Sequence, residues 1–343
     1  MRKFLLNHFV KNLGCHVIAN LGFPLLLHRT LLPNQLTIIM YHAVIRTPLE
    51  VYEQCFLSEA SFRNQVSYLQ THFEVIPLSK AVERMKGGKI LRPTAVITFD
   101  DGFQNNSDIA FPILQQAGLP ATIFLTTGLV NTSDTLWYCR LNRALASSQM
   151  DYFEWDGFRF DLSNREAKAR TAAAIQARLK KFAHSHLMAE LRKIVSELGE
   201  EPDSPIDAGS PYRMLSRQAI TEMVSSGIIE FGAHTHTHAI LSRLPKQEQY
   251  DEIERSVAAI KELTGRSCEL FAYPNGGVED YDADTIAALE KCGVHTSVTT
   301  LVGANNGHTS AMELRRYGVE ANWDMAYFQL LVHHLIAQAR GLV

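Results

Sequence analysis

The stretch AVITFDDG, residues 95–102, joins a run of apolar and β-branched residues to two carboxylates and a glycine. A short uncharged run of this kind is typical of a strand buried in a sheet. Ligands and catalytic groups of α/β proteins lie at the carboxyl ends of the strands. We therefore expect Asp100 and Asp101 at such an end, where the turn at Gly102 lets both reach one cavity. A tight turn or a helix cap is the alternative role for this pair.

Short apolar segments alternate with amphipathic ones on both sides of this stretch. The predicted strands span residues 36–41, 73–76, 95–99, 121–125, 229–233, 270–273 and 296–299. The predicted helices span residues 61–72, 79–85, 109–117, 246–264 and 282–292. Repeated strand–helix units predict an α/β fold built on a parallel sheet or barrel.

The composition excludes several classes of protein. The chain has 343 residues, of which 46% are hydrophobic and 20% charged, with a formal net charge of -3. These values are typical of a soluble globular protein and exclude a disordered chain or a polytopic membrane protein. The charge balance favours no nucleic-acid partner. The five cysteines include no C-x-x-C pair, which favours a reducing compartment such as the cytoplasm.

Residues 1–35 predict an amphipathic helical segment. Apolar residues recur there at spacings of three and four, namely Leu6, Val10, Leu13, Val17 and Leu21. Polar residues interrupt the segment and no cleavage site follows, so we expect no clear signal peptide and no transmembrane helix. Packing on the core, contact with an anionic membrane surface and an atypical secretion signal remain alternatives.

Residues 136–210 depart from the strand–helix alternation. They begin with aromatic-rich turns and continue into a long helical pattern, which predicts a helical insertion beside the mouth of the site. Residues 163–199 contain eight Lys and Arg against three Asp and Glu. This basic surplus is either a solvated face or a surface for an anionic partner such as a glycolipid phosphate.

Three histidines alternate directly after a predicted strand, in IEFGAHTHTH at residues 229–238. His234 and His238 are four residues apart, so one helical turn places both imidazoles on one face. In an extended segment, any two of the three, or all of them with His236, can converge instead. Two imidazoles and one carboxylate form a ligand set that leaves metal positions open for water and substrate.

The segments TFDDG at 98–102, the histidine segment and FAYPNGG at 271–277 resemble the motifs of the polysaccharide deacetylases. These enzymes are the NodB-homology group of carbohydrate esterase family 4. The resemblance covers roughly residues 36–135 and 211–320. It implies a distorted (β/α) barrel of about seven strands with a helical insertion. We therefore expect a catalytic domain at residues 36–322, followed by a C-terminal helix at residues 323–343.

The resemblance also implies roles for individual residues. Asp101, His234 and His238 would bind one divalent metal ion, expected to be Zn²⁺, although Co²⁺, Mn²⁺ or Ni²⁺ suit the same ligands. Asp100 would be the general base for a metal-activated water. The backbone N–H of Asn275, where the family has Tyr, would stabilise the oxyanion.

The sequence departs from the family pattern at two places. Ala272 replaces the arginine that orients the base, and Arg316 is our candidate substitute, with a surface arginine as the alternative. The C-terminal Leu-x-His motif that delivers the general acid is missing. Tyr41-His42 resembles a pair on the first strand of the poly-N-acetylglucosamine deacetylases, so His42 is the candidate acid, with a structural histidine as the alternative.

Aromatic side chains near the third motif are candidates for binding sugar rings. Tyr273 is our candidate substrate-binding aromatic residue beside Asn275. Trp137 and Trp155 of the insertion are further candidates for stacking. Packing in the core explains each of these three aromatic residues equally well.

We therefore expect a metal-dependent hydrolase of non-peptide carbon–nitrogen bonds. It would remove N-acetyl, or else O-acetyl, groups from a cell-envelope polysaccharide or glycolipid. One alternative is a deformylase or amidase acting on a lipid-linked sugar, with peripheral contact to a membrane. Another is a metal-containing glycan-binding module that lost catalysis with Ala272.

Overall fold

A computed structural model describes residues 24–26, 28, 34–88, 90 and 92–335. Most of the amphipathic segment predicted at residues 1–35 therefore lies outside the described residues, as do residues 336–343 of the predicted C-terminal helix. The described part of that helix is α12, Met325–Val332. None of the helices within the described ranges is both long and apolar enough to cross a lipid bilayer.

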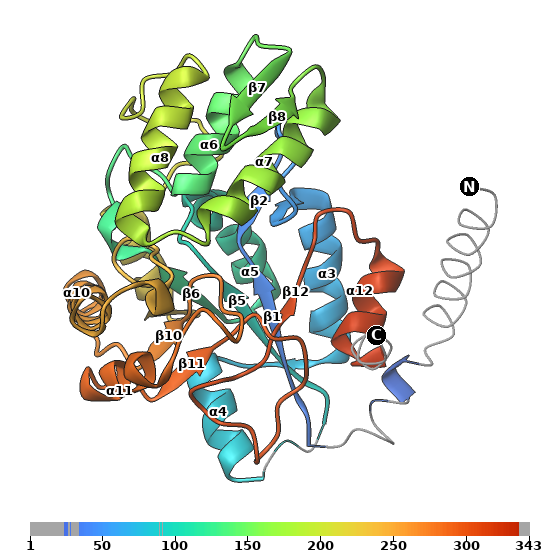
Figure 1. Ribbon diagram of the computed structural model, residues 1–343. Helices are drawn as coiled ribbons and strands as arrows, with labels where there is room; N and C mark the ends of the chain where they lie inside the picture. Colours follow the sequence, from blue (N-terminus) through green and yellow to red (C-terminus); the bar gives the residue numbers. More distant parts are fainter. Residues whose placement is uncertain (1–23, 27, 29–33, 89, 91, 336–343) are drawn as a thin grey trace.

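A parallel sheet forms the centre of the molecule (Figure 1). Its strands follow chain order around the sheet: β1 (Leu36–Tyr41), β5 (Thr94–Phe99), β6 (Ala121–Leu125), β9 (Ile229–Ala233), β10 (Leu270–Ala272) and β11 (Thr296–Val298). The last strand, β12 (Tyr317–Gly318), pairs with the other side of β1, and β4 (Glu74–Val75) pairs with the start of β5.

The two edges of the sheet approach each other. A parallel bridge between Val298 and Leu314 places β11 against the chain that leads into β12. The sheet therefore curls towards a closed barrel. The barrel is distorted, because a single bridge joins the two edges where a full strand pairing would close it. The predicted α/β barrel-like fold of about seven strands is confirmed.

Helices pack against both faces of the curled sheet. They are α3 (Glu59–His72), α4 (Leu78–Lys86), α5 (Phe111–Ala117), α9 (Arg217–Ser226), α10 (Lys246–Thr264) and α11 (Ala283–Lys291). A π-helical turn, Asn106–Ala110, precedes α5, and two short 3-10 turns, Thr127–Leu129 and Leu241–Arg243, follow β6 and β9.

Alternate side chains of each strand supply different hydrophobic clusters. In β1, Ile39 and Tyr41 belong to the cluster that includes residues of α3, α5 and α10, whereas Leu36 and Ile38 belong to a second cluster with residues of β10, β11 and α4. Successive strand residues point to opposite faces. Burial on both faces explains why these strands are continuous apolar runs in the sequence.

The predicted strands and helices begin and end within two residues of the observed ones, apart from elements that the sequence did not reveal. Helix α9, the parallel pair β2 (Ala43–Ile45) and β3 (Phe56–Ser58), and β12 were not predicted. The three strands have three residues or fewer, which is too short for a periodic pattern.

The insertion forms a unit with its own hydrophobic core. It contains α6 (Trp137–Ser147), the hairpin β7 (Tyr152–Trp155) and β8 (Phe158–Asp161), α7 (Arg165–Leu179) and α8 (His184–Glu197). Leu141, Ile175 and Ile194 are completely buried in this core. Figure 1 shows the unit at one end of the molecule, opposite α4 and α11. Part of the segment predicted as aromatic-rich turns is therefore a hairpin, and the helical pattern is two helices.

Candidate metal centre

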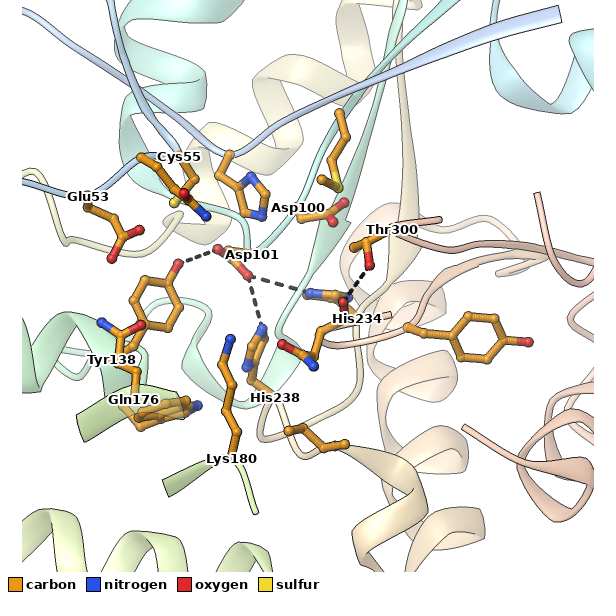
Figure 2. Close-up of a pocket in the computed structure, with 17 residues that line it drawn as sticks. Glu53, Cys55, Asp100, Asp101, Tyr138, Gln176, Lys180, His234, His238 and Thr300 are labelled. Carbon is orange, nitrogen blue, oxygen red and sulfur yellow. Dashed lines mark hydrogen bonds and ion pairs between the residues drawn. The ribbon is translucent and has the colours of Figure 1, made fainter. Parts of the chain in front are cut away.

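Most of the predicted site residues follow the carboxyl ends of strands, at one edge of the parallel sheet. His42 follows β1, Asp100 and Asp101 follow β5, and His234 follows β9. They line a cavity of about 330 Å³ together with residues of the insertion (Figure 2). The sheet therefore brings together residues far apart in the chain, such as His42 and His234, which are 192 positions apart.

Three side chains form a group that can bind a metal ion. Oδ1 of Asp101 lies 3.5 Å from Nε2 of His234 and 3.3 Å from Nε2 of His238. One ligand atom from each residue lies within 4.8 Å of the other two. Burial alone would raise the pKa of Asp101, but the two imidazoles beside it hold that pKa well below its ordinary range. The group therefore offers an ionised carboxylate and two ring nitrogens to one cation.

The hydrogen bond of His234 fits the role of a ligand. Its Nδ1 lies 2.7 Å from the backbone oxygen of Ala272, which only accepts hydrogen bonds, so Nδ1 carries the proton. Nε2 is then free to bind a metal ion, and the ring orientation is fixed. Nδ1 of His238 is buried without a hydrogen-bond partner in the described structure. Both imidazoles and Asp101 suit a divalent ion, with Zn²⁺ among those that accept this ligand set.

Tyr138 of α6 binds the other oxygen of Asp101. Its hydroxyl donates a 2.6 Å hydrogen bond to Oδ2. Oδ1 therefore remains the oxygen that faces the two imidazoles (Figure 2). Sequence reasoning missed Tyr138 as a site residue, because it lies in the insertion and belongs to no motif.

The backbone is strained at the metal group. Asp101, Thr235 and His238 have φ angles of 74°, 60° and 62°, and Gly102 has a φ of 84°. Residues other than glycine seldom adopt such angles, and each costs about 1–3 kcal/mol. A Cβ at Gly102 would lie 2.7 Å from the side chain of Leu125, so this position also requires glycine for space. Strain of this kind concentrates where the fold must aim functional side chains.

Asp100 forms a buried pair with Arg316. Two nitrogens of the guanidinium lie 2.7 Å from Oδ1 and Oδ2, and Nε donates a 2.8 Å hydrogen bond to the backbone oxygen of Thr299. Arg316 is completely buried and not a surface residue. Burial raises the pKa of Asp100, but the charge and hydrogen bonds of Arg316 outweigh this effect and hold the pKa below its ordinary value. Asp100 is therefore ionised at neutral pH.

Ala272, at the end of β10, belongs to the hydrophobic cluster shared with α4. Its methyl side chain has no hydrogen-bond donor, so it cannot bind Asp100 as Arg316 does. The guanidinium at Asp100 thus comes from a residue 216 positions further along the chain.

His42 and Asn275 lie on the wall of the same cavity. The backbone oxygen of His42 accepts a 2.7 Å hydrogen bond from Nδ2 of Asn106, which holds this turn in place. Asn275 has a φ of 63°, and its side chain donates a 2.6 Å hydrogen bond to Asp280. Among the residues that the structure describes, no acceptor bonds the backbone N–H of Asn275.

The candidate aromatic residues and His236 are placed differently from one another. Tyr273 lines the cavity, but its ring is buried and stacks on Tyr281 with 4.1 Å between ring centroids. Trp137 also lines the cavity from the insertion core, whereas Trp155 donates a hydrogen bond to Glu190 of α8. Nδ1 of His236 lies 3.1 Å from Oγ1 of Thr127, outside the metal group.

Several residues that line the cavity were not predicted. They come from the loop before β3, from the insertion and from the turn after β11: Glu53, Gln54, Cys55, Tyr138, Gln176, Lys180 and Thr300. Each stands in a segment without a chemical motif, so only the packing of the insertion and of these loops around the strand ends reveals them. Among the described residues, Asp101, His234 and His238 are the only group of three or more His, Cys, Asp or Glu side chains whose ligand atoms lie close enough together to bind one metal ion.

Comparisons of the sequence with known proteins point to one family. The family model described as polysaccharide deacetylase matches residues 88–297. YxkH of Bacillus subtilis (strain 168) is 22% identical over 288 residues, which are 84% of this chain and 72% of that protein. The poly-beta-1,6-N-acetyl-D-glucosamine N-deacetylase of Staphylococcus epidermidis is 29% identical over 96 residues, 28% of this chain and 32% of that protein.

A solved structure extends the similarity to nearly the whole fold. The Streptococcus pyogenes deacetylase PplD, in complex with acetate, superposes with a TM-score of 0.57. The superposition covers 89% of this chain and 98% of that chain at 16% sequence identity. At this identity the likeness shows the shared fold alone.

Proposed function

This chain belongs to the polysaccharide deacetylase family, whose members hydrolyse N-acetyl amide bonds of carbohydrates, and we propose that it does so with one divalent metal ion held by Asp101, His234 and His238. The observation that carries the proposal is the convergence of this group with Asp100 and His42 in one cavity. We propose Zn²⁺ as the natural ion, with Co²⁺, Mn²⁺ and Ni²⁺ as ions that the same ligands accept.

The proposed reaction needs a base for the attacking water. A bound divalent ion would supply Lewis acidity towards the water and the acetyl oxygen. Asp100 accepts a proton from the water while the water oxygen bonds to the acetyl carbon. Arg316 fixes both carboxylate oxygens, so the base keeps one orientation. Because Arg316 also lowers the pKa of Asp100, this base is ionised but weak. A weak base is sufficient if a bound metal ion lowers the pKa of the water.

The carbon–nitrogen bond then breaks, and the nitrogen needs a proton. We propose that His42, at the carboxyl end of the neighbouring strand β1, donates this proton to the leaving nitrogen. The products are acetate and the free amine of the sugar. The unpaired N–H of Asn275 is a donor for the oxyanion, and it does not depend on the side chain, which is engaged with Asp280. Tyr273 would contribute to the cavity wall as a rigid, packed residue.

We propose an N-acetylated glycan or glycolipid of the cell envelope as the substrate. Similarity to the Staphylococcus epidermidis enzyme that acts on poly-beta-1,6-N-acetyl-D-glucosamine supports a polymer of N-acetylglucosamine. The hypothesis of an inactive glycan-binding module depended on Ala272. Because Arg316 binds Asp100, the base retains its guanidinium, and we favour the hydrolase. We also propose residues 36–322 as the catalytic domain, with 136–210 as its insertion, 1–35 as an amphipathic segment and 323–343 as a final helical segment.

The test combines metal analysis with product release. The full chain, His238→Ala and His236→Ala are purified, and bound metal is measured by elemental analysis. Acetate release from N-acetylglucosamine oligomers is then measured after reconstitution with Zn²⁺. We expect about one ion per chain and acetate from the wild type, both lost in His238→Ala and both kept in His236→Ala, because His236 lies outside the metal group.

Metal retention by His238→Ala would contradict the proposed ligand set. A wild-type protein that holds the ion but releases no acetate would contradict the proposed reaction. Formate release from N-formylated sugars by that same protein would then favour the deformylase alternative.

A further inference from the structure

One cationic side chain of the insertion reaches the catalytic cavity. Lys180 is the C-cap residue directly after the last residue of α7, and Gln176 lies one turn before it on the same face of the helix. Both line the cavity with Asp101 and His238. Figure 2 shows the side chain of Lys180 running beside His238, with its amine directed towards Asp101. The metal group therefore has an ammonium group as a neighbour.

The ammonium group of Lys180 has no partner in the described part of the chain. No carboxylate oxygen lies within 4.0 Å of its Nζ, and no acceptor hydrogen-bonds it. Three other cations of the insertion are engaged: Lys168 donates to two backbone oxygens, Arg178 pairs with Asp156, and Lys193 pairs with Glu190. Lys180 is also half-buried, so it has lost part of its hydration without a protein partner in exchange.

The charges around the cavity leave room for an anion. The charged lining residues are Glu53, Asp100, Asp101 and Lys180. Arg316 neutralises Asp100, and Glu53 accepts a hydrogen bond from Asn142, outside ion-pair distance of Lys180. Without a metal ion, the cavity and Arg316 together carry one excess negative charge. With a divalent ion the excess becomes one positive charge, and a neutral sugar leaves this charge unbalanced.

We propose that Lys180 recognises an anionic group, a phosphate or a carboxylate, carried by the reacting sugar or by its adjacent linkage. The inference rests on the proposed function, because the metal group fixes where the N-acetyl group must lie. The anionic group would then lie on the side of the sugar that faces α7. A flexible ammonium group binds such anions as a point charge, without the fixed geometry of a guanidinium. The insertion would thus distinguish anionic from neutral N-acetylated sugars, whereas the residues at the strand ends contact the N-acetyl group that both kinds of sugar share.

The test compares charged and neutral probes of similar size. The probes are methyl N-acetylglucosaminide, N-acetylglucosamine 1-phosphate and N-acetylmuramic acid, which carry no charge, a phosphate and a carboxylate. The proteins are wild type, Lys180→Met, Lys180→Arg and, as a matched control, Lys181→Met. Lys181 is the next residue, is exposed and does not line the cavity, so its substitution removes the same charge from the same place in the chain.

Two measurements are made on each protein. The first is kcat/KM for acetate release from the Zn²⁺-loaded protein, expressed as the ratio of each charged probe to the neutral probe. We expect Lys180→Met to lower the ratio for at least one charged probe by about 10- to 100-fold, mainly through KM, as for the loss of a charge-assisted contact. Lys180→Arg should keep much of the ratio, and Lys181→Met should keep all of it. The probe with the larger effect identifies phosphate or carboxylate as the recognised group.

The second measurement is the Kd of the charged probes by calorimetry, with and without Zn²⁺. We expect Lys180→Met to raise the Kd both with and without Zn²⁺. If the phosphate were held only by the ion, its Kd would rise on metal removal and would not change in Lys180→Met. Equal charged-to-neutral ratios and equal Kd values in wild type and Lys180→Met would overturn the inference. Binding that depends on Lys180 without any acetate release would support it while contradicting the proposed reaction.

Discussion

Arg316 places two nitrogens 2.7 Å from the two carboxylate oxygens of Asp100, although 216 residues separate them in the chain. Both side chains are buried, so the charges are largely removed from water. A pair of this kind is costly to break from one side only, since the remaining charge is left buried without compensation. The pair therefore connects the last strand of the sheet to the candidate base.

Substitution of Arg316 should affect both stability and turnover. Arg316→Met leaves Asp100 ionised and unpaired, and we expect a loss of about 3–5 kcal/mol in the free energy of unfolding, measured in urea. We also expect kcat for acetate release to fall, because the base loses its fixed orientation. Arg315→Met, at the exposed neighbouring position, serves as the control. A stable Arg316→Met protein would show that the pair contributes little to the fold.

Tyr138→Phe tests the hydrogen bond that orients Asp101. The ring is kept, so the fold should be retained, but Oδ2 loses its 2.6 Å donor. Partners that orient a metal ligand typically contribute about 10- to 100-fold in metal affinity. We expect the Kd for Zn²⁺, measured by competition with a chelator, to rise by about that factor. Tyr152→Phe, at an exposed position of β7, should leave the Kd unchanged. An unaltered Kd in Tyr138→Phe would rule out this orienting role.

His42→Gln tests the proposed general acid. Loss of a general acid slows turnover by about 10²–10⁴-fold, and we expect kcat to fall in this range. Bound metal should remain at the wild-type level, because His42 is outside the metal group. His308→Gln, in an exposed loop, provides the comparison. Loss of metal together with activity would instead indicate that His42 is a ligand.

Three buried histidines should make the fold sensitive to acid. His28, His333 and His334 lie together, with Tyr68 hydrogen-bonded to His333 and Tyr317 to His334. Burial lowers the pKa of His28 to about 4, that of His333 to about 2 and that of His334 to about 3. The unfolded chain, with pKa values near 6.5, therefore binds protons at pH 5.5 that the folded chain does not.

Stability should accordingly fall as the pH falls below about 6.5. We expect a loss of about 1 kcal/mol for each of the three histidines between pH 7 and pH 5.5, measured by urea unfolding. His334→Asn should reduce this loss by about a third, since asparagine tolerates the φ of 66° at this position. His308→Gln should leave the pH dependence unchanged. A wild-type stability that is flat over this range would show that the histidines titrate normally.

Much of the barrel could be predicted because its signals are local. The strands at residues 36–41, 121–125 and 229–233 have the predicted bounds, since buried parallel strands are continuous apolar runs bounded by polar residues. The short strands β2, β3 and β12 could not be found in this way. The strands β2 and β3 pair with each other and β12 pairs with the distant β1, and the residue pattern within each short segment does not encode this pairing.

The sequence by itself determined where the longer barrel strands lie along the chain and which polar residues follow them, because apolar runs and short motifs are properties of neighbouring residues. Only the tertiary structure decided which distant groups meet these residues. Arg316 reaches Asp100, Tyr138 reaches Asp101, Lys180 enters the cavity, and the ring of Tyr273 is buried. These outcomes depend on how the insertion and the last strand pack against the sheet, and that packing is set by contacts between segments far apart in the chain.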